Sequence, residues 1–136
     1  MRLLTSIERY QRLDDIADYL GLSKARTRKA LEFLVNVGLC VEKDGVYQIG
    51  PARTHLGAGD ELLPRHHGNW REKAIQRSEK LSDEEMMFTA PLTIAEKDIP
   101  RVRQILLKLV SEVSQVVEDS TAEKIYCLNL DWFEVS

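Results

Sequence analysis

The chain has 136 residues, a net charge of −3, 43% hydrophobic residues and 30% charged residues. This length allows one ordinary domain or two very small ones, and the hydrophobic share excludes intrinsic disorder. No apolar run reaches the roughly 18 residues of a membrane span, so we expect a cytoplasmic protein that does not bind membranes. Cys40 and Cys127 lie far apart in apolar segments, which predicts two buried free thiols.

The acidic total hides an uneven distribution of charge. Residues 1–50 contain eight basic and seven acidic residues, which gives +1, whereas the remainder contains eleven basic and fifteen acidic residues, which gives −4. Four of the eight N-terminal cations lie between Lys24 and Lys29, without an acidic residue among them. This local basic patch predicts an anionic partner despite the net charge of the chain.

Three helices are predicted before residue 40. The first covers about residues 2–10. The second begins near Leu13, with acidic residues in its first turn, and ends at Gly21, which can adopt a left-handed conformation. Ser23 is the expected N-cap of a third helix that runs to Val35. The apolar side of that third helix consists of Thr27, Ala30, Leu31, Leu34 and Val35.

A hairpin is predicted directly after these helices. Residues 39–43 and 46–49 are strand-like and flank Asp44-Gly45, a favoured two-residue hairpin turn. The order helix, helix, helix, hairpin resembles the winged helix-turn-helix family of DNA-binding proteins over about residues 2–50. The residues that carry the resemblance are Ile16, Ala17, Leu20, Gly21, Leu22, Ser23, Leu31, Leu34, Gly38 and Leu39.

This resemblance implies that the helix at residues 23–35 enters the major groove of double-stranded DNA. Arg26 is suited to reading guanine, and the neighbouring cations are suited to phosphates. The expected DNA-binding residues are Ser23, Lys24, Ala25, Arg26, Arg28, Lys29 and Lys43. The alternative is a protein-interaction module that uses the winged helix as an assembly surface, because Glu32 and Phe33 also turn outward and suit a phosphate poorly.

A second domain is expected after a linker. Residues 51–61 contain a proline and two glycines and lack periodicity, so we divide the chain into domains at 1–50 and 62–136. The second domain is predicted to contain a helix within 62–81 that begins near Asn69, a strand over 86–94, a helix after Asp98 as its cap, and a strand over 124–135. Two strands separated by a helix favour parallel pairing. The predicted fold class is α+β, a winged helix-turn-helix followed by a small helix-strand-helix-strand α/β domain.

The helix after Asp98 has the clearest pattern in the chain. Its apolar row repeats at steps of three and four residues: Ile99, Val102, Leu106, Leu109, Val113 and Val116. One narrow sheet cannot cover this surface, which predicts a homodimer. The alternative is packing of the helix within its own chain.

Candidate chemistry in the second domain is sparse. Trp70, Arg71, Asp131 and Trp132 could form an Arg71–Asp131 pair and a pocket for a small ligand, or simply a structural hydrogen-bond network. His66 and His67, together with Asp60 and Glu61, raise a third reading, a metal-dependent enzyme, although adjacent helical histidines point about 100 degrees apart. No phosphate loop, nucleophile elbow or zinc-type spacing is present in the sequence. We therefore expect no catalytic residues, no metal and no cofactor.

A more specific resemblance extends from about Leu13 to Val135. Residues 54–56, 65–74, 88–92 and 127–133 are similar to a group of bacterial transcriptional regulators whose C-terminal half is a domain of unknown function. The most specific segments are Asn69-Trp70-Arg71 and the run from Asn129 to Phe133. Members of that group carry a further helix-turn-helix region upstream, so we expect this chain to be a fragment or a shortened member. The resemblance implies a regulator, and it brings no catalytic residues, cofactor or known ligand with it. From the residues of the second domain we expect an unknown small-molecule or protein signal.

Overall fold

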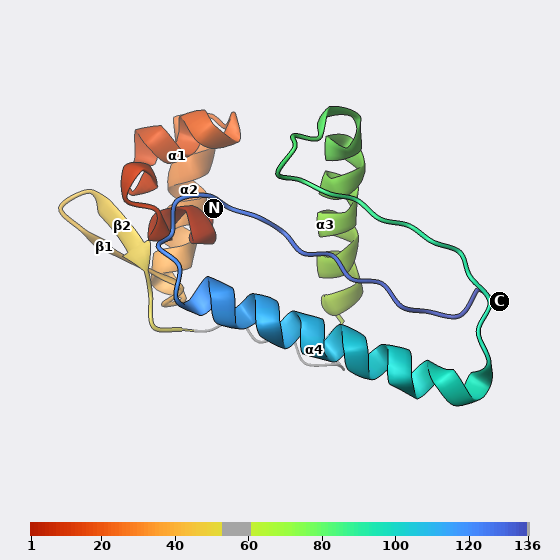
Figure 1. The fold of residues 1–136 in the computed structure, drawn as a ribbon. Helices are drawn as coiled ribbons and strands as arrows, with labels where there is room; N and C mark the ends of the chain where they lie inside the picture. Colours follow the sequence, from red (N-terminus) through yellow and green to blue (C-terminus); the bar gives the residue numbers. More distant parts are fainter. Residues whose placement is uncertain (53–60, 136) are drawn as a thin grey trace. The chain divides into compact units, whose positions relative to one another are not determined.

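The computed structural model describes residues 1–52 and 61–135. Its fold class is mixed α+β, with α-helices and one small antiparallel hairpin in the described part of the chain (Figure 1). The chain divides into two compact units, which are described separately below. The described part of the first unit is residues 1–52 with Thr121–Tyr126, and that of the second is residues 61–120 and 127–135. Most of the predicted linker, including Thr54-His55-Leu56, lies outside the described residues.

The first unit begins with two short 3-10 helices, η1 (Arg2–Ser6) and η2 (Glu8–Tyr10), and the prediction of one continuous helix was wrong. Ile7 separates them in an extended conformation, with φ −98° and ψ 118°. Local hydrogen bonds account for the tight turns, because Thr5 Oγ1 donates to Arg2 O at 2.8 Å and Ser6 Oγ donates to Leu3 O at 2.7 Å. Such bonds from short hydroxyl side chains compete with the regular α-helical pattern.

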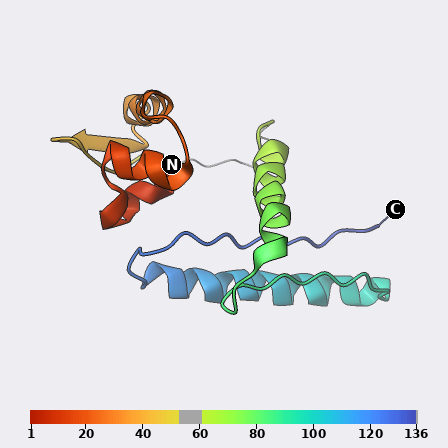
Figure 2. The same ribbon diagram turned by 90° about the horizontal axis from the view of Figure 1, so that it is seen from above.

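The next two helices, α1 (Leu13–Leu20) and α2 (Lys24–Asn36), confirm their predictions. Gly21 ends α1 in the left-handed region with φ 62°, which a residue without Cβ adopts at little cost. Ser23 caps α2, since its Oγ accepts the Arg26 N–H at 3.4 Å. The two helices are thus joined by a turn that fixes where α2 begins (Figure 2).

The hairpin is confirmed as well, with β1 (Cys40–Lys43) antiparallel to β2 (Val46–Ile49). The turn residues Asp44 and Gly45 both have positive φ, 54° and 76°. This is the backbone that a two-residue hairpin turn needs to match the twist of its strands. The Glu42 carboxylate accepts the Gly45 N–H at 2.6 Å and adds a side-chain bond to the turn.

The core of the first unit brings η1, α1 and α2 together through Leu4, Ile16 and Leu31, all fully buried. Ile125, which is distant in the sequence, packs against this cluster and explains why Thr121–Tyr126 belongs to the first unit. Arg2 closes the base of the hairpin, because its guanidinium donates to Leu39 O at 3.1 Å and to Ala52 O at 2.7 Å.

The second unit contains α3 (Leu63–Arg77), η3 (Ser78–Lys80), η4 (Glu96–Asp98) and α4 (Ile99–Glu118). The start of α3 near Asn69 was a wrong prediction: Pro64 lies in the first turn, where its missing N–H interrupts no helical bond. Asp98 directly precedes α4 as predicted, but its side chain makes no capping hydrogen bond. None of the residues described in this unit is buried.

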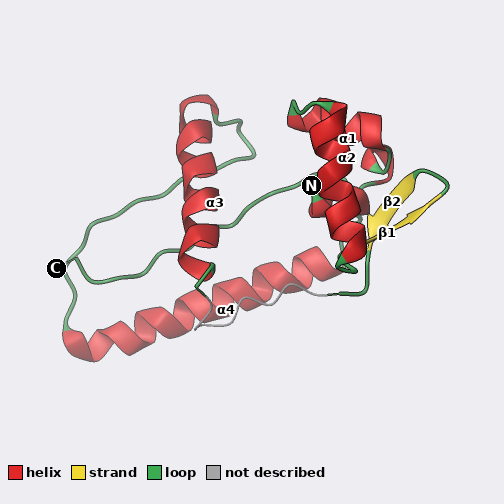
Figure 3. Cartoon of the chain, turned by 180° about the vertical axis from the view of Figure 1, so that it is seen from behind, coloured by secondary structure: helices red, strands yellow, loops and turns green. Residues whose placement is uncertain are grey.

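The predicted strands over 86–94 and 124–135, and their parallel pairing, were wrong. Both segments are extended but belong to no sheet, and β1–β2 is the only sheet among the described residues (Figure 3). Alternating side chains predict an extended backbone, whereas a strand also needs a neighbour that exchanges hydrogen bonds with it. The helix-strand-helix-strand arrangement is therefore replaced by two helices with extended connections.

Candidate functional site

The outward side of α2 carries a cluster of four basic residues of the first unit. Thr27 and Leu31 point inward and are fully buried, which fixes the rotation of the helix. Helical periodicity then turns Ala25, Arg26 and Lys29 outward, as predicted, whereas Ala30 is half-buried. We call the basic face of α2 the exposed set Lys24, Arg26, Arg28 and Lys29.

Three further predicted residues lie around this face. Ala25 is exposed and leaves the surface between the cations free of a bulky side chain. Ser23 is exposed and acts as the N-cap, so its hydroxyl is already engaged with the helix backbone. Lys43 is exposed at the end of β1, beside the hairpin turn.

One cation of the basic face is paired. Lys24 Nζ lies 2.9 Å from Asp14 Oδ2, and both side chains are mostly exposed to solvent. The hydrogen bond and the charge of Asp14 raise the pKa of Lys24 above its ordinary value. Within the described residues, no carboxylate forms a comparable ion pair with Arg26, Arg28 or Lys29. These three cations therefore carry the uncompensated charge of the face.

The later turns of α2 have a different character. Glu32 is exposed, and Phe33 has 61% of its surface accessible. Val37, just beyond the helix, is 44% accessible. An acidic and apolar surface of this kind is unsuited to phosphate and suits a protein contact.

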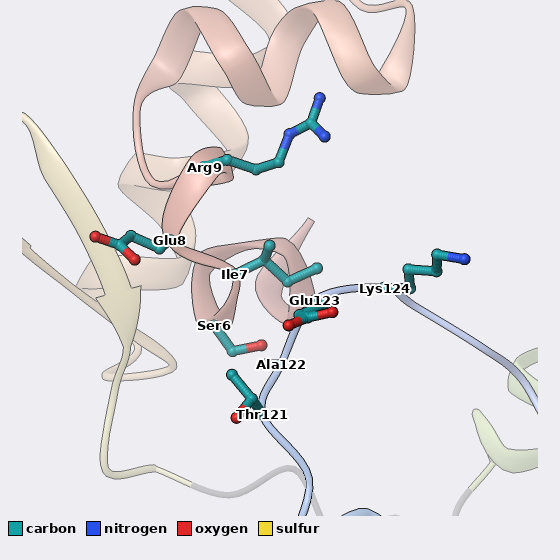
Figure 4. A pocket seen from close by; sticks show the side chains of 8 residues that line it. All are labelled: Ser6, Ile7, Glu8, Arg9, Thr121, Ala122, Glu123 and Lys124. Carbon is teal, nitrogen blue, oxygen red and sulfur yellow. The ribbon is translucent and has the colours of Figure 1, made fainter.

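An open surface depression occurs elsewhere in the first unit, between η1–η2 and residues 121–124 (Figure 4). It is lined by Ser6, Ile7, Glu8, Arg9, Thr121, Ala122, Glu123 and Lys124. Acidic and basic side chains alternate around it, and the buried lining residue Ile7 is apolar. The depression thus contains no buried polar group aimed at a ligand.

In the second unit, the predicted pair of Arg71 and Asp131 is confirmed. Arg71 Nε donates to Asp131 Oδ1 at 2.8 Å, and a second guanidinium nitrogen contacts the same oxygen. The Asp131 hydrogen bond raises the pKa of the Arg71 guanidinium. Arg71 also donates to His67 O at 3.0 Å within α3. The pair anchors the C-terminal extended segment on α3.

A small-ligand pocket around this pair remains a prediction. Trp70 is half-buried, and its ring lies edge-on to His66 with centroids 6.4 Å apart. Trp132 is 37% accessible. Because Arg71 and Asp131 neutralise each other, they provide little uncompensated charge for a ligand.

The residues that suggested a metal site do not form a metal-binding group among the described residues. His66 and His67 are exposed, with ring centroids 5.9 Å apart. Among the described residues, no group of three histidine, cysteine or acidic side chains could hold a metal ion. Asp60 falls outside the described residues.

Three findings at these sites differ from the sequence-based expectation or were missed by it. Cys40 is buried as expected, but Cys127 is exposed, so that prediction was wrong. Asn129 Nδ2 donates to Trp70 O at 3.4 Å, a long-range contact without a local sequence signal. Glu85 accepts from Arg77 at 2.8 and 2.7 Å and from Ser82 N at 2.8 Å. The serine and glutamate spacing of a capping box could have revealed the last of these bonds.

The fold and the site together define a small α+β protein that presents a basic helix face beside a two-stranded hairpin. The chain belongs to the family described as "Domain of unknown function (DUF4423)", whose model matches residues 1–135. No curated protein and no solved structure matches the chain. No helix in the described part of the chain combines the length and apolar character that a membrane crossing requires.

Proposed function

We propose that the chain is a cytoplasmic, sequence-specific DNA-binding regulator of transcription whose first unit is a winged helix-turn-helix. In this proposal α2 is the recognition helix, the hairpin β1–β2 is the wing, and two copies act together as a dimer. The second unit serves dimerisation and reception of a small-molecule or protein signal. No catalytic step is assigned to the chain.

The observation that carries the proposal is the placement of Arg26, Arg28 and Lys29. All three are exposed on one helix, and none forms an ion pair within the described residues. Their charge is therefore available to an anionic partner, and α2 has the dimensions of an element that fits the major groove. Arg26, near the N-terminal end of α2, is the residue proposed to read a guanine, with the others on phosphates.

The first test identifies the DNA. Genomic fragments are selected with the full chain at low salt, and affinity for the recovered sequence is measured by fluorescence anisotropy at several salt concentrations. Each phosphate contact contributes about −0.9 to the slope of log K against log salt. Binding that falls steeply with salt supports the proposal, and failure to recover any fragment at low salt contradicts it.

Variants then locate the contacts. Arg26→Ala should reduce the discrimination between guanine and another base at the contacted position by roughly 1–3 kcal/mol. Lys29→Ala should weaken binding to all DNA sequences alike and reduce the dependence of affinity on salt. Lys80→Ala removes the same charge from η3 and serves as the matched control. If all three variants lose affinity equally, net charge explains binding and the assignment to α2 fails.

A second candidate function is assembly with a protein through the winged helix. The exposed Phe33 and its neighbour Glu32 favour this reading, because they occupy the same helix as the basic face. The variant Phe33→Ser separates the two functions. DNA affinity should be unchanged under the first proposal, whereas a protein-binding surface centred on Phe33 would lose its partner.

A further inference from the structure

The apolar row of α4 is only partly covered. Val102 and Leu106 are half-buried, but the remaining members of the row, Ile99, Leu109, Val113 and Val116, are exposed. α3 and α4 scarcely touch, and no residue described in the second unit is buried. Because burial of apolar surface is the main favourable term in folding and association, this helix requires a covering surface.

One edge of the row has an ordered charge pattern. Residues separated by seven, four and seven positions return to the same side of an α-helix, so Arg101, Lys108, Glu112 and Asp119 lie along one edge. Their charges read positive, positive, negative, negative in chain order. Read from the opposite end, the same edge is negative, negative, positive, positive.

The helix itself does not account for this order. The positive end of the helix dipole lies at the N-terminus, where acidic residues are favourable, and the negative end favours basic residues. α4 has the reverse distribution, with no acidic residue in its first turn and no basic residue in its last. Within the edge, Lys108 Nζ and Glu112 Oε1 are 3.5 Å apart, and both side chains are largely exposed.

We propose that the surface that covers α4 is α4 of a second copy of this chain, packed in the antiparallel direction. In a two-fold arrangement of antiparallel helices, each edge faces the same edge of its partner with the chain direction reversed. Arg101 and Lys108 then face the partner's Glu112 and Asp119, and the two apolar rows bury each other. In a parallel two-fold pair this edge would face the opposite edge of the partner helix, so Arg101 and Lys108 would not meet Glu112 and Asp119.

Each part of the surface has a separate role in this dimer. The apolar row, with steps of three and four residues, supplies affinity and allows side chains to interdigitate. The exposed charges add little affinity each but discriminate between directions, because only the antiparallel direction brings opposite charges together along this edge. The inference deepens the dimer named in the proposed function, and it does not depend on DNA binding.

The first test is the mass of the full chain in solution without DNA, measured by analytical ultracentrifugation across concentrations. Wild type should dimerise, and added salt should weaken the dimer. Arg101→Glu with Lys108→Glu makes the edge wholly acidic and should raise the dimer dissociation constant about tenfold or more. The further changes Glu112→Lys and Asp119→Lys reverse the pattern completely and should restore the dimer. Lys73→Glu with Lys80→Glu on α3 and η3 is the matched control of equal charge.

The second test measures direction. Spin labels on Lys97→Cys, with Cys127→Ser to remove the exposed native thiol, should lie roughly 40 Å apart in an antiparallel dimer, from the helix rise of 1.5 Å per residue. A monomer at every concentration, or two closely spaced labels from parallel helices, would overturn the inference. A dimer that binds no DNA contradicts the proposed function alone, and a monomer that binds DNA contradicts this inference alone.

Discussion

Lys24 and Asp14 form an ion pair across the turn between α1 and α2, with Nζ 2.9 Å from Oδ2. The pair ties the first residue of α2 to the first turn of α1 and occupies one of the four cations of the basic face. Any anionic partner of this face must compete with Asp14 for Lys24. The pair therefore lowers the charge that α2 offers.

Removal of the competing carboxylate should strengthen DNA binding. Asp14→Asn frees Lys24 for a phosphate, and we expect affinity to rise about twofold to fivefold at low salt, the range of an exposed ion pair. Anisotropy with the selected DNA measures the change. Asp15→Asn is the control because it removes the same charge one residue away. Equal gains in both variants would show that Lys24 has no special role.

Substitution by valine should change the free energy of unfolding in opposite directions at the two buried threonines of the first unit. Thr27 Oγ1 is buried and has no hydrogen-bond partner among the described residues, so Thr27→Val should raise the free energy of unfolding by about 1 kcal/mol. Thr5 Oγ1 donates to Arg2 O at 2.8 Å, so Thr5→Val should lower it by about 1 kcal/mol. Urea unfolding followed through methyl NMR signals of Ile16 and Leu31 reports on this unit. A loss of stability in both variants would indicate that the Thr27 hydroxyl has a partner.

The Arg71–Asp131 pair should control local opening of the C-terminal segment more than global stability. Both side chains are partly exposed, so the pair contributes little to the free energy of unfolding. Asp131→Asn should lower the backbone NMR order parameters of residues 127–135 and leave those of α4 unchanged. Glu134→Gln removes a nearby charge and should change neither. Unchanged order parameters in Asp131→Asn would show that other contacts hold the segment.

Glu85 should remain ionised in acid. Its hydrogen bonds from Arg77, and then from Ser82, lower the pKa of Glu85 from 4.5 to about 2. Since the folded value lies below the unfolded one, the stabilisation is complete above pH 4.5 and is lost as the pH falls toward 2. An NMR titration of the carboxyl carbon measures this pKa, and Arg77→Gln should shift it back toward 4.5. A wild-type value near 4.5 would contradict the three-bond arrangement.

The first unit was largely predictable because its signals are local. Gly21, Ser23 and the Asp44-Gly45 turn each require a particular backbone conformation, and the structure has that conformation at each place. The early 3-10 helices were missed because the Thr5 and Ser6 hydroxyls bond to nearby carbonyls, which periodicity does not reveal.

The second unit was less predictable because its order depends on distant partners. Alternation correctly predicts an extended backbone around Leu128 and Leu130, but it does not specify whether another strand lies beside it. The pairing of Arg71 with Asp131 followed from opposite charges in two distinctive motifs, whereas the Asn129 bond to Trp70 O required the folded chain. On α2, the buried Thr27 and Leu31 made the exposed cations predictable from helical spacing alone.

The packing of Ile125 against the first core has a consequence for how the chain can be divided. Thr121–Tyr126 belongs to the first unit although the second unit precedes it, so the polypeptide passes between the units three times. The two units thus alternate along the sequence and do not follow one another as separate consecutive segments. A piece of the chain that stops at Gly50 would leave one side of its own core unfilled, and studies of the basic face require the whole sequence.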